Sequence, residues 1–113
     1  MRSKIKILEF PVFCGYEVHV EFTSDIAQSL LKYPPTRKIE MDDQTSWLAV
    51  HNMDAPQSFI FLPYDAPAGS IAHEAWHVVR RMMEHAGVEL DNETVAYHLG
   101  YLVNQIFKFA RRK

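Results

Sequence analysis

The sequence predicts a small α+β domain in which a mixed or antiparallel sheet of about four strands precedes two helices. Side chains in residues 4–10 and 16–22 alternate between two faces, which is typical of strands. Residues 59–62 form a continuous apolar run, which favours a strand covered on both faces. From residue 71 onward, apolar side chains recur at the i, i+3, i+4 and i+7 spacing of amphipathic helices. A length of 113 residues with 48% hydrophobic content fits one domain, 1–113, with one core.

The first half of the chain is expected to contain two strands and one helix. In residues 16–22 the apolar side chains share one face and the polar ones share the other, so His19 is expected to be solvated. The Thr-Ser-Asp sequence at 23–25 is typical of a helix N-cap, and Pro34 and Pro35 set the limit of the helix that follows. Residues 36–43 fit either a loop or a further short strand.

A hairpin is expected immediately before the C-terminal helices. Residues 45–51 are mixed in character, residues 58–62 are mostly apolar, and the turn-forming residues 54–57 lie between them. Because an edge strand tolerates polar side chains better than an inner one, residues 45–51 are predicted to form the edge and residues 58–62 to lie inside it.

Two helices are expected to complete the fold. Ser70 suits the N-cap of a helix that starts at Ile71, and Gly87 suits its end. Asp91 or Asn92 then begins a second helix of about residues 92–110. The expected apolar stripes consist of Ala72, Ala75, Trp76, Val79, Met82, Met83 and Ala86 in the first helix, and of Ala96, Tyr97, Gly100, Val103 and Phe107 in the second.

The first of these helices carries the sequence His73-Glu74-Ala75-Trp76-His77. Residues i and i+4 lie one above the other on a helix, so His73 and His77 are able to present two imidazoles to one metal ion. Glu74 lies beside them, where it can hold a metal-bound water without being a ligand. Zinc lowers the pKa of such a water to about 7, and the carboxylate takes its proton as the water attacks a carbonyl. The alternative is a solvated helix face with an accidental spacing.

A catalytic zinc site usually needs a third protein ligand, and Glu93 is the favoured candidate. Glu93 falls on the expected apolar stripe of the second helix, where an ionised carboxylate needs a partner such as a metal. Two other candidates are less favoured as ligands. Glu84 lies two turns beyond His77, which is too far to complete the site, and His98 falls on the more polar side of its helix. The alternative role for Glu93 is a first-turn glutamate that complements the helix dipole.

The order of an H-E-x-x-H helix, a short connection and a helix that opens with Asn92-Glu93 resembles the gluzincin group of zinc metallopeptidases, over roughly residues 45–110. In size and connection length the chain looks more like small, single-domain metallopeptidases of phage and prophage genomes than like secreted enzymes. The resemblance implies a zincin-like domain that binds Zn²⁺ through His73, His77 and Glu93, with Glu74 as general base. It also implies an edge strand that pairs with an extended peptide substrate.

The chain departs from gluzincins four residues after Glu93. Those enzymes often have an aspartate there that orients the first histidine, whereas this chain has Tyr97. Tyr97 lies one turn after Glu93, so its hydroxyl is a candidate donor to a ligand or to the developing oxyanion. The alternative is a tyrosine packed in the core.

Composition limits the remaining functional classes. A formal net charge of −2 argues against a nucleic-acid partner held by phosphate contacts, and the basic tail at 111–113 is typical of a solvated helix end. The single cysteine, Cys14, excludes both a disulfide framework and a multi-cysteine zinc site. With neither a signal-peptide pattern nor an apolar run long enough to span a membrane, a cytoplasmic location is expected.

The leading hypothesis is zinc-dependent hydrolysis of peptide bonds in a peptide or protein substrate. The alternatives are a non-catalytic zinc-binding or protein-binding module of the same fold, and a metal-free interaction module in which the motif is accidental. The substrate's sequence and the oligomeric state are not predicted.

Overall fold

The computed structural model describes residues 4–13, 15–25, 28, 48–52 and 56–111 of the chain. Within these ranges the elements are the strands β1 (Lys4–Phe10), β2 (Tyr16–Phe22), β3 (Leu48–Asn52) and β4 (Gln57–Leu62), the 3-10 turn η1 (Pro11–Phe13), and the helices α2 (Ala68–Ala86) and α3 (Asn92–Arg111). The expected α+β class is confirmed. The predicted helix after residue 25 and the open assignment of residues 36–43 fall outside the described residues, apart from Gln28, which is helical.

The strands form one mixed sheet in the order β1-β2-β4-β3. β1 and β2 are antiparallel, β2 and β4 are parallel, and β3 and β4 are antiparallel. The predicted hairpin is confirmed for residues 48–52 and 57–62, and among the strands that the structure describes β3 lies at the edge and β4 inside it. In β4, Phe59, Ile60, Phe61 and Leu62 are all buried, as expected of an inner strand.

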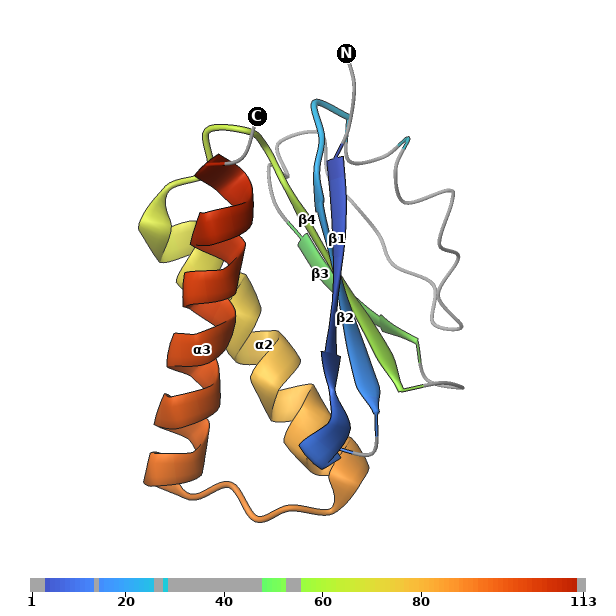
Figure 1. The fold of residues 1–113 in the computed structure, drawn as a ribbon, viewed down its shortest axis with the longest axis vertical. Coiled ribbons are helices and arrows are strands. Elements are labelled where there is room, and N and C mark those ends of the chain that lie inside the picture. The colour runs from blue at the N-terminus through green and yellow to red at the C-terminus, as the bar shows by residue number, and fades with distance from the viewer. Residues whose placement is uncertain (1–3, 14, 26–27, 29–47, 53–55, 112–113) are drawn as a thin grey trace.

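The two helices cover one face of the sheet and run in opposite directions (Figure 1). α2 packs against β3 and β4, and α3 packs against α2. Aromatic rings also join α3 to β1 and β2, because Tyr101 meets Phe10 and Phe109 meets Phe22. The ammonium of Lys4 donates to the carbonyls of Phe109 and Ala110 at 3.0 and 3.2 Å, which ties the start of β1 to the end of α3. None of the helices in the described part of the chain is long and apolar enough to cross a membrane.

The start of α2 differs from the prediction. The helix begins at Ala68, with Pro67 as its N-cap, and no side chain caps it. The backbone N–H groups of Ser70 and Ile71 both donate to the carbonyl of Pro67 at 3.1 Å, so helical bonding is already established before Ser70. The predicted Ser70 cap is therefore wrong. Gly87 does end the helix, in the left-handed conformation with φ 69°, and Val88 donates back to Met83 at 2.9 Å.

Both helices are rotated relative to the predicted stripes. Trp76 was expected in the core but is 37% exposed, whereas Glu74 is buried. In α3 the expected core positions Ala96, Tyr97 and Gly100 are exposed. The helix instead buries Leu102, Ile106 and Phe109, and partly buries Val95, Leu99, Val103, Phe107 and Ala110. Since α3 is apolar over most of its circumference, periodicity alone could not choose the buried face, and the face with the purely apolar Leu102, Ile106 and Phe109 is the one that is buried.

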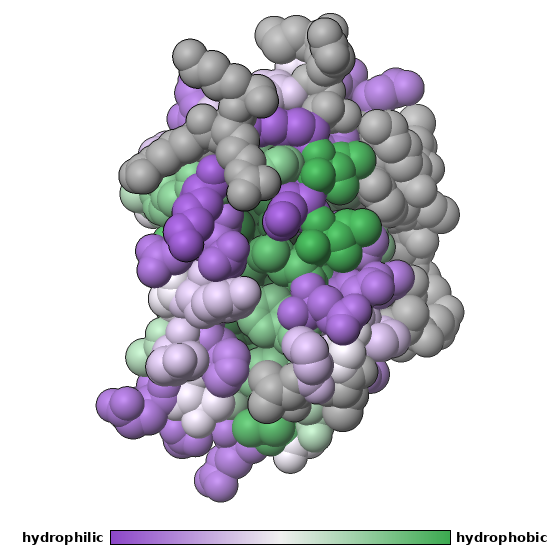
Figure 2. All heavy atoms as spheres, viewed as in Figure 1, coloured by the Kyte–Doolittle hydropathy of each residue, from purple (hydrophilic) through white to green (hydrophobic). Residues whose placement is uncertain are grey.

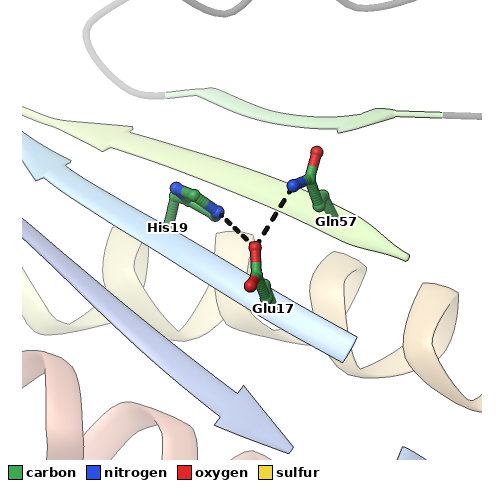
Figure 3. A network of polar contacts seen from close by, with 3 residues as sticks. All are labelled: Glu17, His19 and Gln57. Atoms are coloured by element: carbon green, nitrogen blue, oxygen red, sulfur yellow. Dashed lines mark hydrogen bonds and ion pairs between the residues drawn. The ribbon is translucent and has the colours of Figure 1, made fainter. Parts of the chain in front are cut away.

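His19 is not solvated, contrary to the expectation from strand alternation. Its side chain is only 12% exposed, and its ring lies 4.9 Å from that of Phe59. Figure 3 shows its Nε2 directed at the carboxylate of Glu17, 3.1 Å away, while Gln57 donates to the same oxygen at 3.2 Å. These two hydrogen bonds, first that of His19 and then that of Gln57, lower the pKa of Glu17. The polar face of β2 is thus partly covered rather than open to water.

The start of α3 yields a testable prediction about stability. The backbone N–H and the hydroxyl of Thr94 each donate to the Asp91 carboxylate at 2.8 Å, and these bonds lower the pKa of Asp91. Because the folded-state pKa is lowered, the stabilisation is present above the ordinary carboxyl pKa and is lost as the pH falls through the folded value. Asp91→Ala is expected to lower the melting temperature at pH 7, and the difference should shrink as the pH falls below the ordinary aspartate pKa of about 4.

The control for this prediction is Glu89→Ala, which removes an exposed carboxylate from the same connection without touching the cap. Thermal melts of both variants at several pH values make the measurement. Equal melting temperatures for Asp91→Ala and the parent protein at pH 7 would show that the Asp91 cap adds nothing to the stability of α3.

Candidate metal centre

His73 and His77 lie one turn apart on the exposed side of α2, and the structure brings their side chains together. Their Nε2 atoms are 3.2 Å apart, and their rings meet edge to face with centroids 4.8 Å apart. Both side chains are exposed, that of His73 by 63%. The spacing along the helix therefore converges two imidazole nitrogens on one accessible point.

The distance between these nitrogens suits a shared zinc ion. Two nitrogens that each lie 2.0–2.1 Å from zinc at a tetrahedral angle are about 3.3 Å apart. The 3.2 Å separation in the structure is close to that value. At this distance the Nε2–H of one ring can also donate to the Nε2 of the other.

Glu74 lies beside the pair but on the buried flank of the helix. Its side chain is 8% exposed, and one carboxylate oxygen is 3.8 Å from Nε2 of His73. The backbone N–H of Ala49 on β3 donates to the same carboxylate. Burial raises the pKa of Glu74, while the two histidines and the Ala49 hydrogen bond act in the opposite direction. A carboxylate with a raised pKa next to two imidazoles is suited to accept and release a proton.

The hydrogen bond between Ala49 and Glu74 is possible because β3 is an edge strand. A strand at the edge of a sheet has one row of backbone N–H and C=O groups that the sheet itself does not use. One of them, the N–H of Ala49, is directed at Glu74. The edge strand, the buried carboxylate and the exposed histidines thus form one continuous site, hereafter the HExxH site, defined by Ala49, His73, Glu74 and His77.

Glu93 is not brought to this site. His77 lies nine residues before the end of α2 (86 − 77), which is roughly 13 Å along the helix axis. Glu93 lies in the first turn of α3, at that far end of the helix pair, and its side chain is exposed. Among the described residues, no three His, Cys, Asp or Glu side chains form a group that could hold a metal ion. The assignment of Glu93 as third ligand stays a prediction, without the buried environment that first favoured it.

Tyr97 also lies apart from the HExxH site. It is 76% exposed, its ring contacts His98, and it forms no hydrogen bond or ring contact with His73, Glu74 or His77. His98 donates from Nδ1 to the backbone carbonyl of Thr94 at 2.9 Å and packs against Phe13. The core-tyrosine alternative for Tyr97 is wrong, and its catalytic role stays a prediction.

A chain of hydrogen bonds that the sequence did not predict runs across the sheet from β2 through β4 to β3. The hydroxyl of Ser58 lies 2.6 Å from that of Tyr16 and 2.7 Å from Nδ1 of His51. Burial raises the pKa of Tyr16 above its usual value, so it remains a neutral donor. His51 and Ser58 are directly opposite in the β3–β4 register, and this pairing could have been found from the sequence only if the hairpin register had been known.

Comparisons of the chain with protein-family models, with curated proteins and with solved structures found no match.

Proposed function

We propose that the chain is a zincin-like domain that hydrolyses peptide bonds with a zinc-activated water. The observation that carries the proposal is the 3.2 Å separation of the His73 and His77 nitrogens, next to the buried carboxylate of Glu74. An accidental pair of surface histidines would need neither that separation nor a buried acid beside it. The expected cytoplasmic location belongs to the same proposal.

Each group has a separate task in this chemistry. Zinc, when bound between the imidazoles, supplies a Lewis acid and lowers the pKa of a coordinated water to about 7. Glu74 accepts a proton from the attacking water and passes it to the leaving amine. The raised pKa of Glu74 helps the second step, because the protonated carboxyl is easier to form in a buried position.

The edge strand β3 is proposed to bind the substrate. An extended peptide can add to an edge strand through backbone hydrogen bonds, which places its carbonyls along the strand. Since Ala49 on β3 contacts Glu74, a peptide that follows β3 passes the base of the reaction. The substrate class that fits is an unfolded segment of a peptide or protein, recognised mainly through its backbone.

A second candidate is a zinc-binding or protein-binding module of the same fold without turnover. The burial of Glu74, 6% exposed over the whole residue, favours it, because a base must be reached by water and substrate. Loss of the Ala49 hydrogen bond, or movement of the edge strand when a peptide binds, would be needed to open the carboxylate.

The test begins with protein purified without a histidine tag. About one zinc per chain is expected by elemental analysis, together with cleavage of a mixed peptide library that stops when a zinc chelator is added. Zinc without cleavage would select the non-catalytic module. Absence of zinc at every loading condition would leave only the metal-free interaction module.

A further inference from the structure

Arg81 on α2 is a cation without an acidic partner in the described part of the chain. The residue is partly buried, its Nε atom is buried without a hydrogen bond, and no ion pair joins its guanidinium to a carboxylate. An arginine keeps its charge in a protein, and a charge that is withdrawn from water needs a partner. The neighbouring Arg80 is exposed and stays hydrated. Arg81 is therefore a candidate to bind an anion from outside the chain.

Arg81 lies on the same flank of α2 as the buried acid of the HExxH site. Seven residues (81 − 74) separate it from Glu74, which is about two helical turns, so the two side chains lie almost in line and about 10 Å apart along the axis. Glu74 accepts a hydrogen bond from Ala49, so this flank adjoins the edge strand β3. The acid and the guanidinium are thus two points on the side of α2 next to which a peptide bound to β3 would lie.

Buried hydroxyl groups connect Arg81 to the later part of β3. The hydroxyl of Ser58 lies 2.6 Å from that of Tyr16 and 2.7 Å from Nδ1 of His51, which is two residues further along β3 than Ala49. Burial raises the pKa of Tyr16, whereas the Ser58 hydrogen bond and the positive charge of Arg81 act in the opposite direction, so the guanidinium lies near this hydroxyl. β3 and the flank of α2 therefore run side by side from the HExxH site to Arg81.

The opposite edge of the sheet has a different surface. Hydrophobic side chains gather over β1 (Figure 2), where Ile5 and Ile7 are 41% and 53% exposed. A peptide that paired with β1 would meet these apolar side chains, whereas one that paired with β3 would meet the acid and the guanidinium of α2. The two edges thus suit different ligands, and the HExxH site lies at the one with the charged groups.

We propose that Arg81 binds a carboxylate of the peptide that pairs with β3, about three residues from the bond beside Glu74. An extended chain rises about 3.3 Å per residue, so about 10 Å along α2 corresponds to about three residues. The planar guanidinium presents N–H donors that match both oxygens of a carboxylate. The carboxylate can belong to the C-terminus of the peptide or to an acidic side chain, and both present the same chemistry. This inference rests on the proposed function and adds a substrate class to it, namely peptides with an acidic group at that distance.

The cleavage test uses synthetic peptides built on one sequence that the parent protein cleaves. One set carries glutamate or glutamine three residues to either side of the cleaved bond, and the other ends three residues after that bond in a free or an amidated C-terminus. In one set kcat/KM is expected to be at least about 10-fold higher for the acid than for the amide, because only the acid forms a charge-assisted pair with the guanidinium. The set that shows the preference identifies the source of the carboxylate, and equal kcat/KM within both sets would overturn the proposal.

Binding is measured separately, so that carboxylate recognition and hydrolysis can fail independently. A blocked peptide of alternating alanine and threonine with one glutamate, and its counterpart with glutamine, are titrated into the full chain, and the Nε–H resonance of Arg81 is followed by NMR. A saturable shift is expected with glutamate and at least about 10-fold weaker binding with glutamine. This result without any cleavage would support the role of Arg81 and contradict only the proposed hydrolysis. Cleavage with neither a preference nor a selective shift would overturn the role of Arg81 and leave hydrolysis standing.

Variants assign the effect to Arg81. Arg81→Gln is expected to lower kcat/KM for the acidic peptide by about 10-fold, to the value of the neutral peptide, whose own cleavage should not change. Arg81→Lys should keep part of the preference, because the charge remains while the two-point contact is lost. Arg80→Gln is the matched control, since it removes an exposed arginine from the next position on the same helix. If Arg81→Gln keeps the preference, or if Arg80→Gln loses it equally, Arg81 does not bind the carboxylate.

Discussion

Glu74→Gln is expected to retain zinc and to lose peptide hydrolysis by at least about 10²-fold, the usual scale for a positioned acid–base group. The physical reason is that the amide has nearly the same shape and still accepts the hydrogen bond from Ala49, but cannot take a proton. Initial rates of cleavage of one peptide identified from the library, at matched zinc content, make the measurement.

Glu84→Gln is the matched control for this variant. It makes the same substitution on the same helix, at an exposed position outside the HExxH site, and is expected to leave turnover unchanged. If Glu74→Gln hydrolyses peptide as fast as the parent protein, Glu74 is not the base. If both variants lose turnover equally, the effect arises from the charge of α2 rather than from proton transfer.

His73→Ala and His77→Ala are each expected to abolish stoichiometric zinc binding. In the proposed metal centre the two nitrogens, 3.2 Å apart, would bind one ion together, so the removal of either would leave a single imidazole with little affinity. Zinc that binds only the folded state raises the free energy of unfolding by about 2.7 kcal/mol at 100 times the dissociation constant. Each variant should therefore lose the rise in melting temperature that zinc gives the parent protein, as measured by thermal melts with and without zinc.

His85→Ala is the control, since it removes a histidine from the same helix outside the HExxH site. If both His73→Ala and His77→Ala retain one zinc per chain, α2 does not hold the metal centre.

The variant Glu93→Ala tests the third ligand in the same experiment. Loss of zinc in that variant would show that α3 contributes a ligand, and full retention would remove Glu93 from the site.

Local sequence patterns correctly predicted those features of the fold that depend on a single kind of local interaction. The alternation in residues 16–22 and the apolar run in β4 predicted strands because a sheet buries every second side chain, or all of them in an inner strand. Gly87 predicted the end of α2 because a left-handed residue there disfavours any side chain with a Cβ. The pairing of His73 with His77 followed from helix geometry alone, since i and i+4 are neighbours on any helix.

The orientation of each helix depended on packing that the sequence does not encode locally. α3 has apolar side chains on most sides, so the choice of its buried face came from the fit of Leu102, Ile106 and Phe109 against α2 and the sheet. That choice exposes Glu93 and Tyr97, which the periodicity had placed in the core. Similarly, Glu74 is buried because the edge strand β3 lies next to it and supplies the N–H of Ala49.

The sequence by itself thus determined the α+β class, the two C-terminal helices and the spacing of the histidine pair, because each of these depends on neighbours within a few residues. Only the tertiary structure decided that Glu74 is a buried, hydrogen-bonded acid and that Tyr97 lies on α3 beside a hollow formed with Phe10 and Pro11. Both of those environments are built from segments far apart in the chain. Their formation depends on how helices rotate to bury the most apolar area, which is a property of the whole core.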